Sequence, residues 1–317
     1  MEILKLNPVF KDYIWGGTRL RDEFKMKTDI NPVAEGWMLA CHKDGMNTID
    51  SGKYNNKTLQ EVIDIEGSVK MLGKNSEKFA YFPVLIKIID AKDNLSIQVH
   101  PDDEYARRVE HEFGKTEIWY VLDADEGAEL IYGFKNKISK EEFRKAIENN
   151  TLPEVLNSVK VHKGDLFFIE AGTVHAIGKG TLIAEIQQNS NSTYRVYDYG
   201  RLGKDGKPRE LHIDKAVDVT VTEPPKYGTK PQGKPEKING GKKQLLTSCE
   251  LFTVYRYDCE SEIELTAGEE SFNHLLIIEG NGNINGRQFK KGDSYFVPAG
   301  YGKYKIEGNA EIILTKI

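Results

Sequence analysis

The stretch Gly164-Asp-Leu-Phe-Phe-Ile-Glu-Ala-Gly-Thr-Val-His175 decides the fold, because it returns late in the chain as Gly292-Asp-Ser-Tyr-Phe-Val-Pro-Ala-Gly-Tyr-Gly-Lys303. Each copy begins at a Gly-Asp turn, runs through an aromatic strand and ends at a second tight turn. A strand precedes each copy, Glu117-Ile-Trp-Tyr-Val-Leu-Asp in one case and Asn273-His-Leu-Leu-Ile-Ile-Glu in the other. Chance likeness between Gly-Asp turns is the alternative; the repeated pair of segments predicts two related barrels.

Strand patterns also dominate the rest of the chain. Short β-branched and aromatic runs are bounded by Gly, Asn and Asp, which is typical of an all-β sandwich or barrel. Helical patterns are few: one from Thr58 to Leu72, one that opens at Ser139, and one after Pro101 that Gly114 should stop. We therefore expect a mainly β fold of two barrels, with a few short helices inserted in the N-terminal part.

A stretch rich in Pro, Gly and Lys divides the chain. It runs from Glu223 to Lys243 and has little to bury, so we predict a linker there. The expected domains are residues 1–240, which carry the chemistry, the helices and the linker, and residues 241–317, a smaller barrel.

Composition limits the possible functions. The 317 residues are 39% apolar and 29% charged, which suits a globular protein with more than one core. Three cysteines without a C-x-x-C spacing favour a reducing compartment, and the sequence shows neither a signal peptide nor a membrane-length apolar run. We predict a cytoplasmic protein. The net charge of -5 without a basic stripe argues against nucleic acid as a partner, and the oligomeric state stays open.

The run Leu95-Ser-Ile-Gln-Val-His100 alternates apolar and polar side chains. In a strand, this spacing puts Ser96, Gln98 and His100 on one face and the apolar residues from Leu95 onward on the other. A polar face that points into a barrel is costly unless something satisfies it, and a metal ion does so. We therefore predict that Gln98 and His100 hold one ion.

Two more residues complete the expected metal site. Glu117 opens the next strand and His175 follows the second turn of the repeat; either residue alone is more often structural or solvated. Two imidazoles, a carboxylate and an amide oxygen together suit Zn²⁺ and leave one position for substrate or water. The C-terminal copy has Asn273 and Lys303 at the matching positions, which are poor ligands, so we expect one metal per chain, in the N-terminal barrel.

These segments carry a family resemblance. The first repeat copy and the strand from Glu117 resemble the two motifs of cupins. More specific are the run around Gln98 and His100, Lys115-Thr-Glu-Ile-Trp-Tyr, Asn189-Ser-Asn-Ser-Thr-Tyr-Arg-Val-Tyr-Asp-Tyr-Gly-Arg201, Ile14-Trp-Gly-Gly17 and Ala34-Glu-Gly-Trp37. Together they resemble type I phosphomannose isomerases (mannose-6-phosphate isomerases), particularly the short bacterial form, over nearly the whole chain.

The resemblance implies a fold, a reaction and residue roles. It implies cupin (jelly-roll) barrels and an aldose–ketose isomerase that interconverts mannose 6-phosphate and fructose 6-phosphate through an enediolate. It also implies zinc held by Gln98, His100, Glu117 and His175, and an active-site arginine at Arg195. Two alternatives stay open: a cupin Fe(II) dioxygenase, and a sugar-binding cupin without activity.

An anionic sugar also needs local cations. Lys87 interrupts an apolar run in phase with its neighbours, so we expect it inside the barrel, as a salt-bridged or a ligand-binding residue. Lys115 lies two residues before Glu117 and can share its face. Burial or the metal should lower the pKa of either amine towards that of a base.

Arg195 alternates with tyrosines and suits a phosphate or an enediolate oxygen, with cation–π packing as the structural alternative. Ser96 shares the metal-facing side and suits a hydrogen bond to the phosphate. We thus expect Arg195, Lys115 and Lys87 to be catalytic and Ser96, Lys87 and Arg195 to bind the substrate, a small phosphorylated sugar. The identity of the general base stays open.

Overall fold

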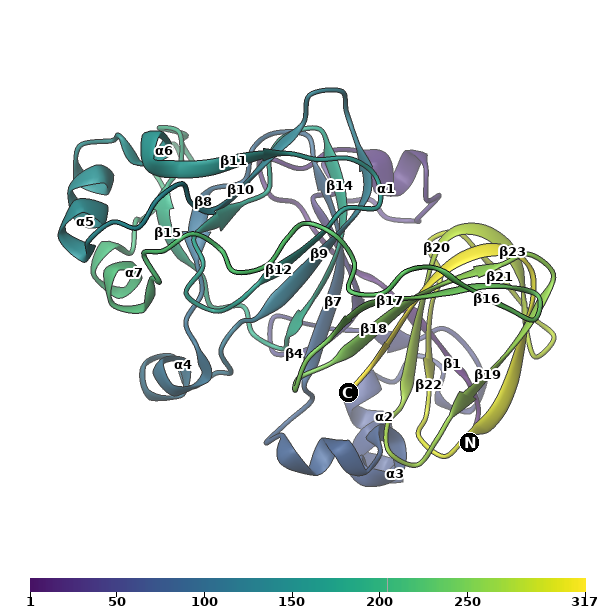
Figure 1. Ribbon diagram of the computed structural model, residues 1–317. Coiled ribbons are helices and arrows are strands. Elements are labelled where there is room, and N and C mark those ends of the chain that lie inside the picture. Colours follow the sequence, from purple (N-terminus) through teal and green to yellow (C-terminus); the bar gives the residue numbers. More distant parts are fainter. Residues whose placement is uncertain (204) are drawn as a thin grey trace.

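The computed structural model describes residues 1–203 and 205–317. It is mainly β and consists of two barrels that lie side by side (Figure 1). Helices are short, and within the described ranges all of them precede residue 220. The predicted fold class is therefore confirmed. In the same ranges, no helix combines the length and the apolar character that crossing a membrane requires.

The N-terminal barrel consists of two sheets that face each other across a core containing Trp119, Leu130 and Phe167. One sheet has six strands in the order β12 (Leu166–Ile169), β9 (Glu117–Ala124), β14 (Thr181–Gln188), β7 (Val84–Ala91), β3 (Glu35–Leu39) and β2 (Val9–Lys11). The other has five in the order β11 (Leu156–Lys160), β10 (Glu129–Phe134), β13 (His175–Ala176), β8 (Ile97–Val99) and β15 (Tyr194–Tyr197). A hairpin of β4 (Cys41–His42) and β5 (Gly45–Met46) lies beside them.

The C-terminal barrel is one ten-stranded sheet that encloses its own core, with Tyr295, Ile312 and Tyr304 among the buried residues. Its main path is β16 (Glu236–Ile238), β17 (Gly241–Ser248), β18 (Thr253–Cys259), β23 (Gly302–Lys316), β20 (Asn273–Ile284), β22 (Ser294–Val297), β1 (Leu4–Asn7) and β6 (Thr48–Ile49). In addition, β19 (Glu262–Ala267) pairs with β23, and β21 (Arg287–Lys290) pairs with β20.

The internal repeat is preserved down to the pairing register. In the first copy, Glu117 on β9 lies opposite Ile169 on β12, and in the second, Asn273 on β20 lies opposite Val297 on β22. The turns repeat as well, because Gly164 and Gly292 have φ of 89° and 88°, a conformation that glycine adopts without strain. The repeat therefore marks two equivalent strand pairs, one in each barrel.

Long strands between the barrels are buried on both faces, which explains their nearly continuous apolar sequences. All eight residues of β7 and of β14 are buried. One face looks into the N-terminal barrel, and the other packs on the C-terminal sheet through a shared core with Ile88, Ala184 and Ile313. A charged side chain on these strands must therefore find its partner inside the protein.

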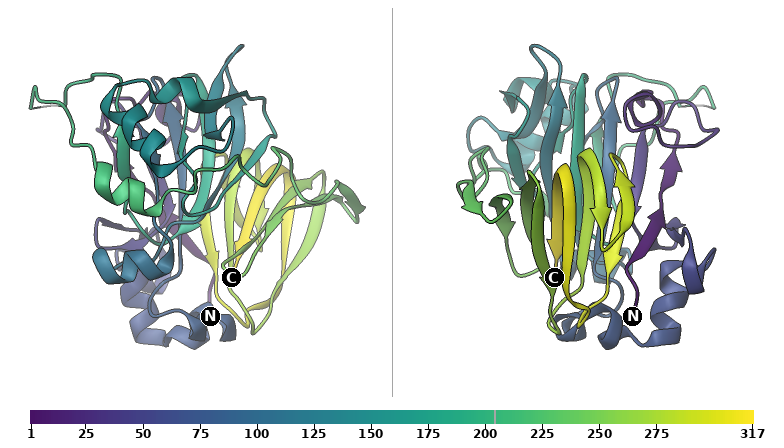
Figure 2. Two further views of the ribbon diagram at one scale, coloured as in Figure 1. Left: turned by 60° about the vertical axis from the view of Figure 1, so that its left-hand side comes forward. Right: turned by 90° about the vertical axis from the view of Figure 1, so that its right-hand side faces the viewer.

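Short helices lie around both barrels (Figure 1). They are α1 (Arg19–Asp22), α2 (Leu59–Glu66), α3 (Ser68–Leu72), α4 (Asp103–Val109), α5 (Lys140–Glu148), α6 (Leu152–Val155) and α7 (Ile213–Val219), with 3₁₀ turns η1 (Gly52–Tyr54) and η2 (Lys74–Lys78). The last three helices cover the outer face of the five-stranded sheet, as Figure 2 shows on its left.

Two of the helix predictions need correction. The capping boxes at Thr58 and Ser139 are present, but the helix expected from 58 to 72 breaks at Gly67, whose φ is 98°. The helix after Pro101 ends at Val109 instead of running to Phe113, which packs against Tyr81.

The predicted linker is only partly irregular. Strand β16 lies inside it and β17 begins before its expected end at Lys243. Moreover, β1 and β6, from the first fifty residues, complete the C-terminal sheet. The division into residues 1–240 and 241–317 stays a prediction, with the chain's start contributing strands to the second barrel.

Asn47 forms hydrogen bonds to backbone groups on both sides of the point where the chain passes from one barrel to the other. Its side chain is fully buried; Oδ1 accepts from the Ala40 amide, and Nδ2 donates to the carbonyls of Asn7 (2.9 Å) and Trp37 (2.8 Å). Asn7 ends β1, and Trp37 lies on β3 of the N-terminal barrel.

We expect Asn47→Ala to lower the free energy of unfolding by about 2–4 kcal/mol, because it leaves buried backbone groups without partners. Urea unfolding measures this loss. Asn55→Ala, at an exposed position, serves as the control and should stay within about 0.5 kcal/mol of the parent. Equal losses in the two variants would show that the buried hydrogen bonds of Asn47 do not contribute to stability in this way.

Candidate active site

Strand pairing brings the predicted metal ligands together inside the N-terminal barrel. On the five-stranded sheet, Gln98 of β8 lies opposite His175 of β13 on one side and opposite Arg195 of β15 on the other. His100 follows the end of β8, and Glu117 begins β9 on the facing sheet. The alternation from Leu95 is broken, however: Ile97 and Val99 pack under the helices, whereas Leu95 faces the barrel interior.

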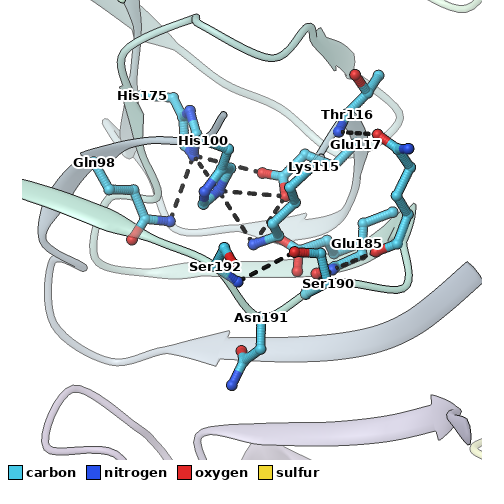
Figure 3. Close-up of polar contacts among 12 residues, drawn as sticks. Gln98, His100, Lys115, Thr116, Glu117, His175, Glu185, Ser190, Asn191 and Ser192 are labelled. Atoms are coloured by element: carbon cyan, nitrogen blue, oxygen red, sulfur yellow. Dashed lines mark hydrogen bonds and ion pairs between the residues drawn. The ribbon is translucent and has the colours of Figure 1, made fainter. Parts of the chain in front are cut away.

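The four side chains converge closely (Figure 3). The Nε2 atoms of His100 and His175 lie 3.1 Å apart, and each is 3.6 Å from a carboxylate oxygen of Glu117. The Gln98 amide nitrogen lies 3.4 Å from His175 Nε2. His100, Glu117 and His175 form a buried group that fits a metal ion, as predicted.

Hydrogen bonds fix how the two histidines face the group. His175 Nδ1 lies 2.8 Å from the Thr173 carbonyl, which accepts only from an N–H, so Nε2 carries the lone pair. The Lys115 ammonium donates to His100 Nε2 over 3.1 Å, which makes that atom an acceptor as well. Two imidazole lone pairs thus point at one space.

A cation explains this arrangement. Glu117 is completely buried, and neither of its carboxylate oxygens accepts a well-aligned hydrogen bond; the Lys115 ammonium, 3.2 Å from Oε2, is an ionic partner at one edge only. Two ligand atoms that each lie 2.0–2.1 Å from a tetrahedral ion are about 3.3 Å apart, close to the spacings found here. A half-turn of the Gln98 amide would present its oxygen as a further ligand.

Burial sets the charge states of these groups. It lowers the pKa of His175 to about 3 and that of His100 well below its usual range, so both imidazoles are neutral. Burial, together with the charge of Glu185, raises the pKa of Glu117. A buried carboxylate of this kind favours a nearby positive charge.

Lys115 supplies one positive charge at the group's edge. Its Nζ lies 3.2 Å from Glu117 Oε2, so the two residues share a face as predicted. Lys115 also lines a cavity that opens to the surface, with Ser96 and Arg195. The predicted catalytic and substrate-binding residues therefore surround one space next to the metal-fitting group.

Lys87 lies inside the barrel, as expected, but its predicted electrostatics are wrong. Its Nζ is 3.1 Å from Glu185 Oε1 and 3.7 Å from Glu35 Oε2. Burial acts to lower the pKa of Lys87, but these carboxylates outweigh it and raise the pKa above its ordinary value. Lys87 is therefore a permanent cation, not a base.

Glu35 and Glu185 were not among the predicted site residues. Each also accepts a hydrogen bond from a buried indole, Glu35 from Trp37 (2.7 Å) and Glu185 from Trp119 (2.9 Å). A charge within an apolar run was the available signal for Glu185, as it was for Lys87.

The cavity has a volume of about 210 Å³. Besides the acidic and basic residues, its walls include the aromatic pair Tyr13 and Trp15, whose rings stack 5.5 Å apart. Arg195 donates to the Ser96 hydroxyl over 3.3 Å, so the two predicted substrate-binding residues touch. Arg209, another residue that the sequence pattern did not single out, also lines the cavity.

The second barrel lacks such a group. Asn273 donates to the Thr266 carbonyl and to the Tyr304 hydroxyl, so its amide serves packing, and Lys303 pairs with Glu264 at the surface. Over residues 1–203 and 205–317, the group in the N-terminal barrel is the one His/Cys/Asp/Glu cluster that fits a metal.

Fold and site define a double-barrel cupin with a metal-fitting centre in one barrel. The model of the phosphomannose isomerase type I catalytic domain matches residues 3–136, and that of the mannose-6-phosphate isomerase cupin domain matches residues 242–317. Mannose-6-phosphate isomerase ManA of Bacillus subtilis is 41% identical over 100% of this chain and 99% of its own, and the Streptococcus mutans mannose-6-phosphate isomerase is 39% identical over 95% and 94%.

Solved structures agree. A crystal structure of the mannose 6-phosphate isomerase from Bacillus subtilis matches with a TM-score of 0.91 and 38% identity over 100% of both chains. The apo form from Salmonella typhimurium shares the fold at 18% identity, with a TM-score of 0.75. The chain belongs to the type I mannose-6-phosphate isomerases and resembles their short bacterial form.

We expect the protein to bind one divalent ion per chain and Glu117→Gln to weaken that binding about 100-fold or more, since loss of even an outer hydrogen-bond partner costs 10–100-fold. Elemental analysis after dialysis against a buffered metal gives the stoichiometry. His162→Ala, which changes an exposed histidine outside the group, should bind like the parent. Unchanged metal content in Glu117→Gln would refute the site.

Proposed function

We propose that this protein interconverts mannose 6-phosphate and fructose 6-phosphate. The single observation that carries the proposal is the metal-fitting group of His100, Glu117 and His175, which adjoins a cavity lined by cations. Membership of the type I family supplies the substrate, since a fold alone does not specify one.

Zinc is the ion that we propose, one per chain, with Gln98, His100, Glu117 and His175 as ligands. Two imidazoles and a carboxylate suit it, and it is redox-inert, as an isomerisation requires. When bound, it would polarise the sugar oxygens and stabilise the charge that develops on them. The chain's own residues must then hold the substrate and move the proton.

Isomerisation transfers a proton between C1 and C2 through an enediolate. We propose Glu185 as the proton acceptor, because it lines the cavity. Burial opposes its ionisation, but the charges of Lys87 and Lys115 outweigh burial and lower the pKa of Glu185. Lys87 fixes this carboxylate, and Lys115, beside the ligands, can stabilise negative charge on the reacting oxygens.

Substrate binding is proposed to rest on Arg195, Ser96 and Lys87. Arg195 suits a phosphate oxygen because its guanidinium is planar and always charged, and Ser96 orients it through their hydrogen bond. We also propose a cytoplasmic location, which the three free cysteines support.

Chelation should abolish conversion of mannose 6-phosphate, and Zn²⁺ should restore it. His100→Ala should lose both its metal and its activity, whereas Arg195→Ala should lose its activity but keep its metal. A coupled assay of fructose 6-phosphate, with metal analysis of each sample, tests all of this. An inactive, zinc-loaded parent would reject the isomerase; oxygen consumption or sugar binding would then favour the dioxygenase or the non-catalytic cupin.

Glu185→Gln should lower kcat by about 10²–10⁴, the range typical of general base catalysis, with the metal content unchanged. Lys115→Met is the companion variant. If it abolishes turnover while Glu185→Gln stays within about threefold of the parent, the proton acceptor is Lys115 and the assignment to Glu185 is wrong.

A further inference from the structure

We propose that Arg209, braced by Asp198, is a specificity residue that selects phosphorylated over unphosphorylated sugars by binding the phosphate together with Arg195. This deepens the proposed function and rests on it. Arg209 lies just after the run from Asn189 to Arg201 that carries part of the family resemblance, and it lines the same cavity as Arg195.

Asp198 holds Arg209 in a fixed position. Arg209 donates to both carboxylate oxygens, from Nε over 2.7 Å and from an Nη atom over 2.5 Å. The carboxylate is 7% exposed, and Arg201 also donates to it over 2.6 Å. A guanidinium held in this bidentate way loses little conformational freedom when an anion arrives.

Arg201 differs from Arg209 in what its other atoms do. It donates to the Asn94 carbonyl and lies over the Tyr199 ring, with its centre 5.2 Å from the ring centroid. The cavity walls include Arg209 but not Arg201. The two arginines thus share one carboxylate, and Arg209 is the one that faces the substrate space.

Arg195 and Arg209 leave positive charge at this side of the cavity. Arg195 donates to two uncharged groups, the Ser96 hydroxyl and the Glu210 carbonyl. Burial, and after it the nearby charge of Arg209, lowers the pKa of Arg195, and both guanidinium groups line the same cavity. An anion bound in that cavity would be attracted to both of them.

The charges match a phosphate monoester. Two arginines share Asp198, and Arg201 also lies 3.9 Å from Asp93, so Arg209 is only partly neutralised and Arg195 adds a further positive charge. A phosphate monoester carries about −1.5 to −2 charges at pH 7. By contrast, carboxylates balance the charges of the two lysines that line the cavity, Glu185 that of Lys87 and Glu117 that of Lys115, so these lysines add no net positive charge for the phosphate.

The test compares Arg209→Met with Arg201→Met, which removes the other partner of Asp198. For each protein, kcat and KM are measured with mannose 6-phosphate and with mannose, and calorimetry gives the Kd of inorganic phosphate. In Arg209→Met we expect the preference in kcat/KM for the phosphorylated sugar to fall by about 10- to 100-fold, mostly through KM, and the Kd of phosphate to rise similarly. In Arg201→Met the preference in kcat/KM and the Kd of phosphate should each change less than about threefold.

Equal losses in the two variants would overturn the proposal, because Arg209 would then merely hold Asp198. A fall in kcat at constant KM would overturn it too. If the parent lacks isomerase activity, the proposed function fails, but the phosphate titration still decides the role of Arg209: an unchanged Kd in Arg209→Met refutes it. Matching thermal unfolding curves confirm that both variants are folded.

Discussion

The convergence of electron-rich ligand atoms inside the N-terminal barrel is the constraint on which the rest of the structure depends. Two imidazole lone pairs and a carboxylate face one another over 3.1–3.6 Å with no solvent to screen them. Such a cluster is costly unless a cation occupies its centre. The surrounding residues therefore have to be rigid, and the barrel supplies that rigidity because its sheets are covered on both outer faces, by helices and by the second barrel.

A second buried charge network lies on the six-stranded sheet. Lys87, Glu35 and Glu185 lie on strands whose outer faces pack on the C-terminal barrel, so their charges can be satisfied only from within. Two tryptophan indoles complete the network. The C-terminal barrel thus contributes to the site without a ligand of its own, by excluding water from the back of the sheet that carries the acidic and basic side chains.

Much of this could be predicted from local sequence, and the reasons are physical. The repeat predicted two strand pairs because Gly-Asp turns fix both the loop conformation and the register that follows. His100, Glu117 and His175 were found because metal ligands need particular residue types at turn and strand ends. Arg209, whose role is proposed from the structure, was not predicted because it lies in a polar loop, where an arginine is usually solvated, and the fold brings it to Asp198. The pKa of Lys87 was predicted in the wrong direction because its partners, Glu35 and Glu185, lie on other strands, 52 and 98 residues away in the chain.

The pairing of β1 with β22 has a consequence for how the protein is made. Leu4 lies opposite Phe296, so one of the first strands to leave the ribosome has its partner among the last. Contacts between such distant segments form slowly, because the chain loses the entropy of closing a long loop before these contacts stabilise it. During synthesis β1 can pair with β6, but its other edge stays unpaired until β22 is made, so the C-terminal barrel can be completed only late in translation.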